Sequence, residues 1–399
     1  MPLQSLCSYL QLLTMPTPSL ILVPARFKTG KLYTPLATTS GGVVLGASGD
    51  FNVTRATTAT RFNSAGLIES VASGIPRLDY YTSGGTAGCP ALLVEPAATN
   101  LALHSRDLTN AVWSGTTVTT AKNAVGADGV ASGATTITAT AASGTVLQAL
   151  SHASQSRVFS AYIRRVSGTG AIQLTTNGGT NWTTVTISSL YTQVACTAQT
   201  VSNGSVGIRM AVSGDVIEVD FTQGEVGPVA TSPMATTTAA VTRNVDEITV
   251  SDAVSGCIGQ TEGTLYAEVD MRVIPQFIVP IAIDVGTVNE YLILAANSDG
   301  AFRVVIKKST GSQTQLIISS SNPVGVYKLA LAYKNGDYAL SINGATPLTS
   351  SDSTNYPTGT FSRVHLSFQA YGVGLCRTRA AALYTTRLTN AQLQALTTL

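Results

Sequence analysis

The sequence predicts a mostly β protein with two antiparallel β-sandwich domains, the first of jelly-roll type, after an irregular N-terminal region. Three observations lead to this prediction. Apolar and polar side chains alternate through many short segments, which is the period of a half-buried strand. Turn sequences rich in Gly, Asn and Asp separate these segments. Charged residues make up only 11% of the chain, while Thr, Ser, Ala, Gly and Val are abundant, and this mixture favours strands over helices.

Length and charge narrow the class of protein. A chain of 399 residues indicates two or three domains rather than one small sandwich. The 23 Lys plus Arg nearly balance the 21 Asp plus Glu, and no basic run exceeds Arg164-Arg165, which argues against a nucleic-acid partner. A surface so poor in charge gives little repulsion between copies, so we expect oligomerisation or burial in a larger assembly.

The cysteines and the N-terminus indicate the compartment. Five cysteines are widely spaced and never form a Cys-x-x-Cys pair: Cys7, Cys89, Cys196, Cys257 and Cys376. We expect small buried thiols in a protein made in a reducing cytoplasm, without a zinc site or a disulfide framework. No Lys or Arg precedes Arg26, so the N-terminus makes a poor signal peptide, and no segment approaches the roughly 20 apolar residues of a membrane span. Translation can begin at Met1 or at Met15, and the sequence leaves this open.

Residues 1–100 are rich in Pro and Gly and contain only short apolar runs. We predict an irregular docking and oligomerisation region, whose short strands lie against another subunit or a scaffold rather than forming a core of their own. In this region we expect Arg55 and Arg61 to pair with nearby acids such as Glu69 and Asp79, or with a neighbouring chain.

Residues 101–235 form the second unit, in which strand patterns repeat. Alternating apolar positions predict strands around Phe159–Ile163, Val206–Val212 and Ile217–Phe221. A glycine-containing loop between Thr175 and Trp182 predicts a hairpin. These antiparallel pairs indicate a sandwich of jelly-roll type. The following residues 236–245, at the end of a Pro- and Thr-rich stretch, are predicted to be an extended linker.

Residues 246–399 form the last domain, where strand candidates recur about every ten to fifteen residues. The clearest signal is a hairpin between Val326 and Gly344. Tyr327, Leu329, Leu331 and Tyr333 alternate with lysines and alanines, Asn335-Gly336-Asp337 supplies the turn, and Tyr338, Leu340 and Ile342 resume the alternation. One face of this hairpin should lie in a sandwich core, and the outer face should be free for contact. A helix is predicted only at the end, where Thr389 and Gln392 have capping-box spacing.

Three stretches of the chain resemble proteins of tailed bacteriophage particles, and together they cover most of its length. The first looks like the N-terminal module of phage tail and head-fibre proteins, and comprises residues 23–33, 50–55, 59–61, 75–80 and 92–101. The second, residues 214–225 with 230–233 and 240–243, is similar to carbohydrate-binding-like jelly-rolls of such fibres. The third, residues 338–344 and 382–389, resembles the concanavalin A and laminin-G-like sandwich.

This resemblance implies a tail-fibre, head-fibre or capsid-decoration subunit on the outer surface of a virion, made in the host cytoplasm. It implies capsid or tail proteins as partners and a homotrimer as the oligomer. Within the N-terminal module, Arg55, Arg61 and Arg77 are the candidate docking residues. A sandwich fold alone does not identify a ligand, because unrelated functions share it.

No catalytic residue, metal site or cofactor is predicted. Glu268 and Asp270 lie two apart on one strand, but glucanases of concanavalin-like fold use a third acid where this chain has Val273. We expect the two acids to be solvated on an exposed face and to pair with Arg272. The histidines His104, His152 and His365 are isolated and are interpreted as structural. Asp246, Glu247, Glu218 and Asp220 could contribute to a calcium site, but no compact oxygen-rich loop accompanies them.

Sugar recognition requires an exposed aromatic ring beside groups that hydrogen-bond to hydroxyls. Asn181 and Trp182, next to Gly178-Gly179, are the candidate ligand-binding pair, although Trp182 also suits a core position at a strand start. Trp113 is expected to be packed.

The function that agrees best with these observations is a non-enzymatic virion subunit that attaches to host-surface protein or glycan by multivalent binding. Two alternatives remain open: a glycan depolymerase with one catalytic sandwich, and a purely structural cement or adaptor protein.

Overall fold

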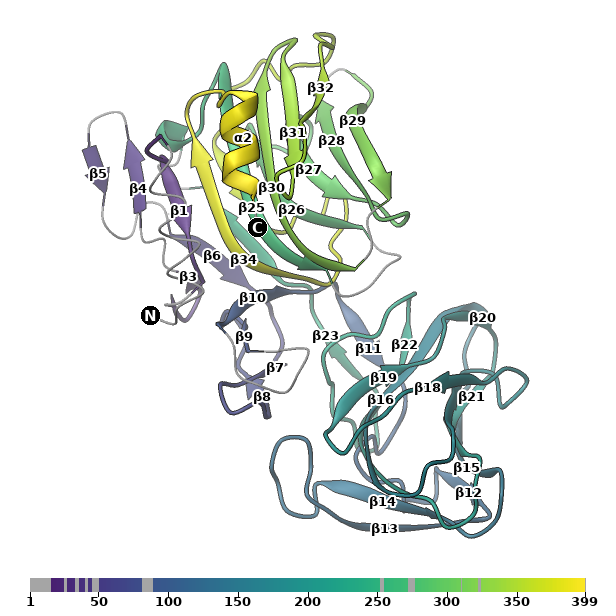
Figure 1. Ribbon diagram of the computed structural model, residues 1–399. Coiled ribbons are helices and arrows are strands. Elements are labelled where there is room, and N and C mark those ends of the chain that lie inside the picture. The colour runs from purple at the N-terminus through teal and green to yellow at the C-terminus, as the bar shows by residue number, and fades with distance from the viewer. Residues whose placement is uncertain are drawn as a thin grey trace.

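The computed structural model describes residues 16–24, 27–32, 36–39, 42–44, 50–80, 89–251, 255–271, 277–309, 311–321 and 324–398. The protein is mostly β, as predicted, and its strands build two lobes (Figure 1). The lower lobe in that view is the jelly-roll lobe. The upper lobe, here called the C-terminal lobe, holds most of the remaining strands. None of the described helices has the length and apolar character needed to span a membrane.

Two sheets form the C-terminal lobe. A 10-stranded sheet runs in the order β32 (Leu348–Ser350), β31 (Tyr338–Ile342), β30 (Gly325–Lys334), β25 (Glu262–Met271), β34 (Cys376–Tyr384), β1 (Leu20–Leu22), β4 (Leu36–Thr39), β5 (Gly42–Val44), with β10 (Ala91–Val94) on β34 and β9 (Leu78–Asp79) on β10. A 9-stranded sheet runs in the order β2 (Phe27–Lys28), β3 (Lys31–Leu32), β6 (Phe51–Thr54), β24 (Glu247–Val250), β33 (Arg363–His365), β26 (Ile278–Asp284), β27 (Tyr291–Ala296), β28 (Ala301–Lys307), β29 (Thr314–Ser321). Between them lies the largest apolar cluster of the described chain.

Two further sheets form the jelly-roll lobe and enclose a second apolar cluster. The 8-stranded sheet contains β13 (Val118–Ala124), β14 (Ala134–Ala139), β22 (Val216–Val226), β11 (Ala98–Asn100), β23 (Val241–Arg243), β16 (Gln155–Ser167), β19 (Thr192–Ala195) and β20 (Gln199–Val201). The 5-stranded sheet runs in the order β12 (Ser114–Thr116), β15 (Gly144–Ala149), β21 (Ser205–Met210), β17 (Ile172–Thr175), β18 (Thr183–Val185). Three short elements remain: the hairpin of β7 (Ala59–Phe62) and β8 (Ile68–Val71), the 3-10 turn η2 (Ser255–Cys257) and helix α2 (Asn390–Thr397).

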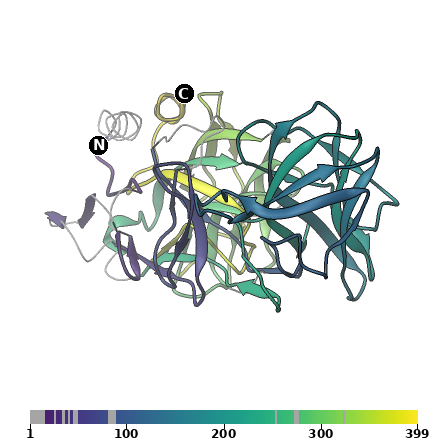
Figure 2. The ribbon, with the colours of Figure 1, turned by 90° about the horizontal axis from the view of Figure 1, so that it is seen from below.

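Strands of the leading region are built into the C-terminal lobe. β1 pairs with β34, placing Leu20 opposite Leu383, and β10 pairs with the other end of β34. β6 pairs with β24 in the second sheet. Figures 1 and 2 both show these purple strands beside the green and yellow lobe. From their sequence, these strands were expected to lie against another subunit or a scaffold. Instead they lie against this chain's own last domain, whose sheet edges satisfy their backbone hydrogen bonds.

The predicted linker also contains regular structure. Val241–Arg243 forms β23, which pairs with β11 of the jelly-roll lobe. Arg243 is buried.

The hairpin predicted between Val326 and Gly344 is confirmed. β30 and β31 pair antiparallel with Leu331 opposite Leu340, and the backbones of Lys334 and Asp337 close the turn with bonds of 3.0 and 2.8 Å. The expectation of a free outer face is wrong, because α2 covers the alanines of that face. Their small side chains leave room for the helix to approach.

Helix α2 has the predicted capping box. The Thr389 hydroxyl accepts from the backbone N–H of Gln392, whose side chain accepts from the backbone N–H of Thr389. The helix places Leu393 and Leu396 against the sheet.

Replacing Thr389 with alanine is expected to lower the free energy of unfolding by about 1 kcal/mol, because the backbone N–H of Gln392 loses its acceptor. Urea denaturation measures this loss, and hydrogen exchange at the Gln392 amide should accelerate. Thr349, exposed on β32, is the matched control, since its replacement removes no cap. An unchanged midpoint for Thr389→Ala would contradict the prediction.

Candidate ligand-binding surface

The β17–β18 hairpin positions the predicted pair Asn181 and Trp182. Its loop turns through Gly178 and Gly179, whose φ values of 71° and 94° lie in the left-handed region that favours glycine. Asn177 holds the loop, since its Oδ1 accepts from the Asn181 backbone N–H at 2.9 Å. Trp182 lies between this turn and β18, which begins at Thr183.

Trp182 is half-buried, and its ring is covered by a cation. The Arg209 guanidinium carbon lies 4.6 Å from the ring centroid. A Cβ placed on Gly179 would come within 2.9 Å of Trp182 Cζ2, so loop backbone also lies against the ring. From its sequence, Trp182 suited either an open stacking ring or a core tryptophan. The ring instead supports Arg209, while Asn181 is exposed.

Arg209 lies on β21, in register with Gln173 of β17. Its Nε donates to Gln173 Oε1 at 2.7 Å, and Gln173 Nε2 donates to Thr184 Oγ1 at 3.1 Å. In the described part of the chain, neither Nη1 nor Nη2 of Arg209 has a hydrogen-bond or ion-pair partner. We call Trp182, Arg209, Gln173 and Thr184 the Arg209 platform.

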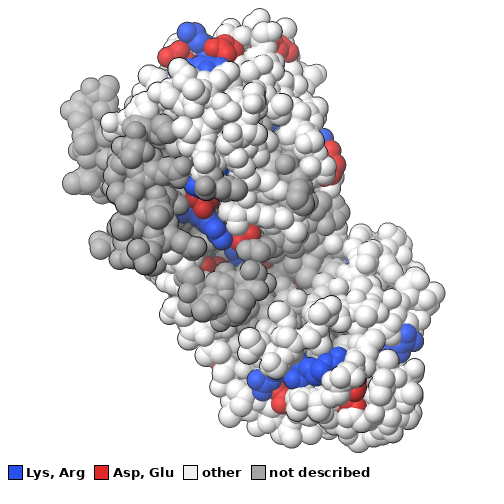
Figure 3. Space-filling view, viewed as in Figure 1, with Lys and Arg blue, Asp and Glu red and all other residues white. Residues whose placement is uncertain are grey.

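No acidic side chain among the described residues pairs with Arg209. In Figure 3 the visible face of the lower lobe is mostly uncharged and carries only small blue and red patches. The ring and Gln173 position the planar guanidinium, whose two terminal amino groups can donate to a carboxylate, a sulfate or sugar oxygens.

Sequence reasoning missed Arg209. Its strand was predicted from Val206, Ile208 and Met210, which face the core, and Arg209 was the charged residue on the other face. That alternation is the one signal that could have identified it.

Comparison with known proteins gives partial likenesses. No family model and no curated protein matches this chain. Among solved structures, the CBM40 of Ruminococcus gnavus IT-sialidase aligns with a TM-score of 0.30 and 15% identity, covering 35% of this chain and 85% of that one. The binding domain of botulinum neurotoxin DC, in complex with rat synaptotagmin II, aligns with a TM-score of 0.32 and 14% identity, covering 38% of this chain and 40% of that one. Domain 4 of AbnA, a GH43 extracellular arabinanase from Geobacillus stearothermophilus, in complex with arabinotriose, aligns with a TM-score of 0.32 and 16% identity. The alignment covers 38% of this chain and 73% of that one.

Two of the three arginines expected to dock lie inside the molecule. Arg55 and Arg77 are 3% and 1% exposed. Arg55 Nη1 contacts Asp246 Oδ1 at 3.0 Å, and Arg77 bridges Asp246 and Glu95, with 2.6 Å from its Nη1 to Glu95 Oε2. Arg243 Nη1 lies 2.8 Å from the same Glu95 oxygen. These five residues form a buried group, here called the junction cluster.

The junction cluster connects the two lobes. Arg243 belongs to β23 of the jelly-roll lobe, and Asp246 directly precedes β24 of the C-terminal lobe. Burial raises the pKa of Glu95, but Arg243 and Arg77 outweigh burial and bring it to about 2. Glu95 is therefore ionised at neutral pH, and Arg77 and Arg243, which both contact its Oε2, compensate its charge.

Arg61 is the half-exposed residue among the three arginines expected to dock. It pairs with Glu69 at 2.7 Å, one of the two partners expected from the sequence. Asp79, the other expected partner, is buried and pairs with Arg377 at 2.6 Å.

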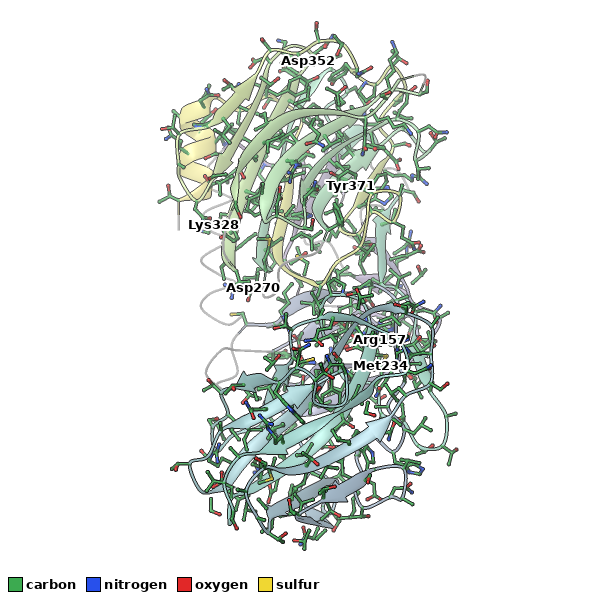
Figure 4. The ribbon with its side chains drawn as sticks, turned by 90° about the vertical axis from the view of Figure 1, so that its right-hand side faces the viewer. Arg157, Met234, Asp270, Lys328, Asp352 and Tyr371 are labelled. Carbon is green, nitrogen blue, oxygen red and sulfur yellow. The ribbon has the colours of Figure 1, made fainter. Side chains whose placement is uncertain are left out.

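Glu268 and Asp270 are not solvated, which corrects the expectation from sequence. They are 6% and 2% exposed, and Arg379 lies 3.8 Å from Glu268 and 3.5 Å from Asp270. Figure 4 places Asp270 at the end of the C-terminal lobe that faces the jelly-roll lobe. Arg272 and Val273 lie outside the described residues. Arg379 was missed because a bulge in β34 brings it to this face.

The remaining candidate ligands are engaged elsewhere. Glu218 pairs with Arg164, and Asp220 with Arg106 at 2.8 Å. Among the residues that the structure describes, no three His, Cys, Asp or Glu side chains are grouped so that they could hold a metal ion. Trp113 is packed as expected, with its indole N–H donating to the Leu103 carbonyl at 3.0 Å.

The cysteines differ in burial, and His152 and His104 lie in different local surroundings. Cys196, Cys257 and Cys376 are buried free thiols, as expected, whereas Cys89 is half-buried and Cys7 lies outside the described residues. His152 is half-buried and lies beside the Ala153 carbonyl, and His104 occupies a left-handed turn with φ 49°.

Proposed function

We propose that this chain is a non-enzymatic adhesion subunit on the outer surface of a tailed-phage particle, and that it binds host-surface glycan through the Arg209 platform. The observation that carries this proposal is an arginine whose guanidinium carbon lies 4.6 Å from the Trp182 ring centroid and whose two terminal amino groups have no hydrogen-bond partner among the described residues. A guanidinium in this state forms paired hydrogen bonds with carboxylate or sulfate groups of an acidic saccharide.

The platform lies on a sheet face, so one copy binds weakly. Affinity then comes from several copies acting together on one particle, which turns each later contact into an intramolecular step. The low charge of the chain favours association between copies, and a homotrimer agrees with the fibre-like sequence stretches. Those stretches also support the assignment to a virion with capsid or tail partners.

Docking on the particle is assigned to exposed parts of the leading region. Arg55 and Arg77 have no exposed donors to offer, whereas half-exposed Arg61 keeps that role in the proposal. Strand pairing of the leading region with the C-terminal lobe would transmit the docked orientation directly to that lobe.

Arg209→Gln is expected to weaken binding to an immobilised uronic-acid polysaccharide at least about tenfold, because a charge-assisted hydrogen-bond pair is lost. Trp182→Ala should weaken it less, since Arg209 loses its support but keeps its charge. Surface plasmon resonance on the intact chain measures both. Arg164→Gln, on the other sheet of the same lobe, is the matched control and should bind like the parent.

Three outcomes would overturn the proposal. The parent protein could bind no acidic polysaccharide, or Arg209→Gln could bind as well as the parent. A fall in polymer length during incubation would show bond cleavage instead, and would favour a depolymerase.

A further inference from the structure

A second site lies on the C-terminal lobe, away from the Arg209 platform. There β24 and β33 pair with Thr249 opposite His365, and the segment after β33 borders a pocket of about 240 Å³. Its polar lining includes Glu247, Thr249, Arg363, His365 and Gln369. Ligand pockets for drug-sized molecules span roughly 300–1,000 Å³, so this pocket suits one sugar ring.

A chain of hydrogen bonds behind the pocket fixes the proton positions. Asp284 is fully buried, and burial raises its pKa, but hydrogen bonds from His365 and Arg363 outweigh burial and lower it. The carboxylate is therefore an acceptor, and His365 Nε2–H donates to its Oδ2 at 2.9 Å. When His365 carries its single ring proton on Nε2, Nδ1 is an acceptor, and the Thr249 hydroxyl, 3.0 Å away, donates to it. The lone pairs of Thr249 Oγ1 are left to accept from a ligand.

Acceptors also dominate the other side of the pocket. Glu247 is exposed, with Oε2 accepting from Thr54 Oγ1 at 3.0 Å and Oε1 accepting from Gln369 Nε2. Because Gln369 uses its amino group on Glu247, its amide oxygen remains an acceptor. Each Glu247 oxygen keeps a second lone pair.

Arg363 supplies the donor. Its Nε and Nη2 each donate to Asp284 at 2.7 Å, while Nη1 has no hydrogen-bond partner among the described residues. The side chain is 27% exposed. The pocket therefore presents three acceptor groups and one charged donor.

We propose that this pocket binds the ring of a neutral saccharide residue through its hydroxyl groups. Sugar hydroxyls donate to Glu247, Thr249 and Gln369, and one hydroxyl oxygen accepts from Arg363 Nη1. An anionic sugar is disfavoured because Glu247 repels it. The inference rests on the proposed glycan-binding function, but it names a different site and a different ligand class.

Saturation-transfer NMR with methyl glycosides of galactose, mannose and N-acetylglucosamine tests the pocket, and methyl glucuronoside is the charged counter-probe. We expect at least one neutral glycoside to bind the intact chain. Glu247→Ala and Thr249→Val should each weaken that binding about tenfold. The matched control is Glu262→Ala. Glu262 is a half-exposed glutamate on β25 that pairs with Lys334, and its replacement should leave glycoside binding unchanged.

The two proposals fail separately. Arg209→Gln should leave neutral glycoside binding intact while it weakens binding of the acidic polysaccharide. No binding of any neutral glycoside, unaltered binding by Glu247→Ala, or loss of neutral binding in Arg209→Gln would each overturn the pocket proposal. Glu247 is exposed, so its alanine variant should fold even if Thr249→Val does not.

Discussion

Replacing Asp246 with alanine is expected to lower the free energy of unfolding by about 3–5 kcal/mol. Asp246 is 1% exposed and accepts from Arg55, from Arg77 and from the backbone N–H of Glu95 at 3.0 Å. Without its carboxylate, Arg55 loses its only ion pair among the described residues and stays buried with an uncompensated charge. Arg77 keeps only Glu95, which it shares with Arg243. Urea denaturation followed by circular dichroism measures the loss.

The control is an ion pair that water reaches. Arg61 and Glu69 have side-chain exposures of 17% and 36%, so Glu69→Ala should cost no more than about 1 kcal/mol. Equal losses for the two variants would contradict the role given to burial. Because the junction cluster connects both lobes, Asp246→Ala should also separate their unfolding transitions.

Local patterns predicted the strands and the helix cap well. In the β30–β31 hairpin, alternation and an Asn-Gly-Asp turn lie within one short segment, so nearest neighbours determine the result. The capping box likewise needs only Thr389 and Gln392. Such short-range features depend little on the rest of the fold.

Contacts between distant segments were not predictable in this way. Leu20 pairs with Leu383, and nothing in either short apolar run identifies its partner. The alanines of β30 were interpreted as an open face because they are small, whereas small size is what admits α2. Arg55 and Arg77 were interpreted as surface residues because Asp246, the acid that pairs with both, lies 191 and 169 residues away in the sequence.

In the candidate sites, too, single residues could be identified from the sequence, whereas their partners on other strands could not. Trp182 was identified because an aromatic residue beside a glycine turn is visible in sequence, but its partner Arg209 lies on another strand. His365 was interpreted as isolated, yet Thr249 and Asp284 contact it from 116 and 81 residues away. Only the sheet register brings these three together.

Stability should fall as pH rises from about 4.5 to 7, because of Glu225 on β22. Burial raises the pKa of this fully buried carboxyl to about 7, although hydrogen bonds from Thr231 oppose the shift. Between these pH values the folded state keeps a proton that the unfolded state has released, so folding becomes less favourable with each step upward. The total change is about 3 kcal/mol, and it is complete above pH 7.

Glu225→Gln should remove this dependence. The amide oxygen can still accept from the Thr231 backbone N–H, as the carboxylate does at 3.1 Å, and no charge is buried at high pH. We expect the variant to exceed the parent by up to about 3 kcal/mol at pH 8 and by progressively less toward pH 4.5. Glu95, with its pKa of about 2, acts with the opposite sign and below this window, since its contribution is lost as pH falls from about 4.5 through 2. Urea denaturation at pH 5, 6, 7 and 8 gives the comparison, with Glu262→Gln, at a half-exposed position, as the control. A stability difference that stays constant with pH would contradict the assignment, because only a proton held differently by folded and unfolded chains produces a slope.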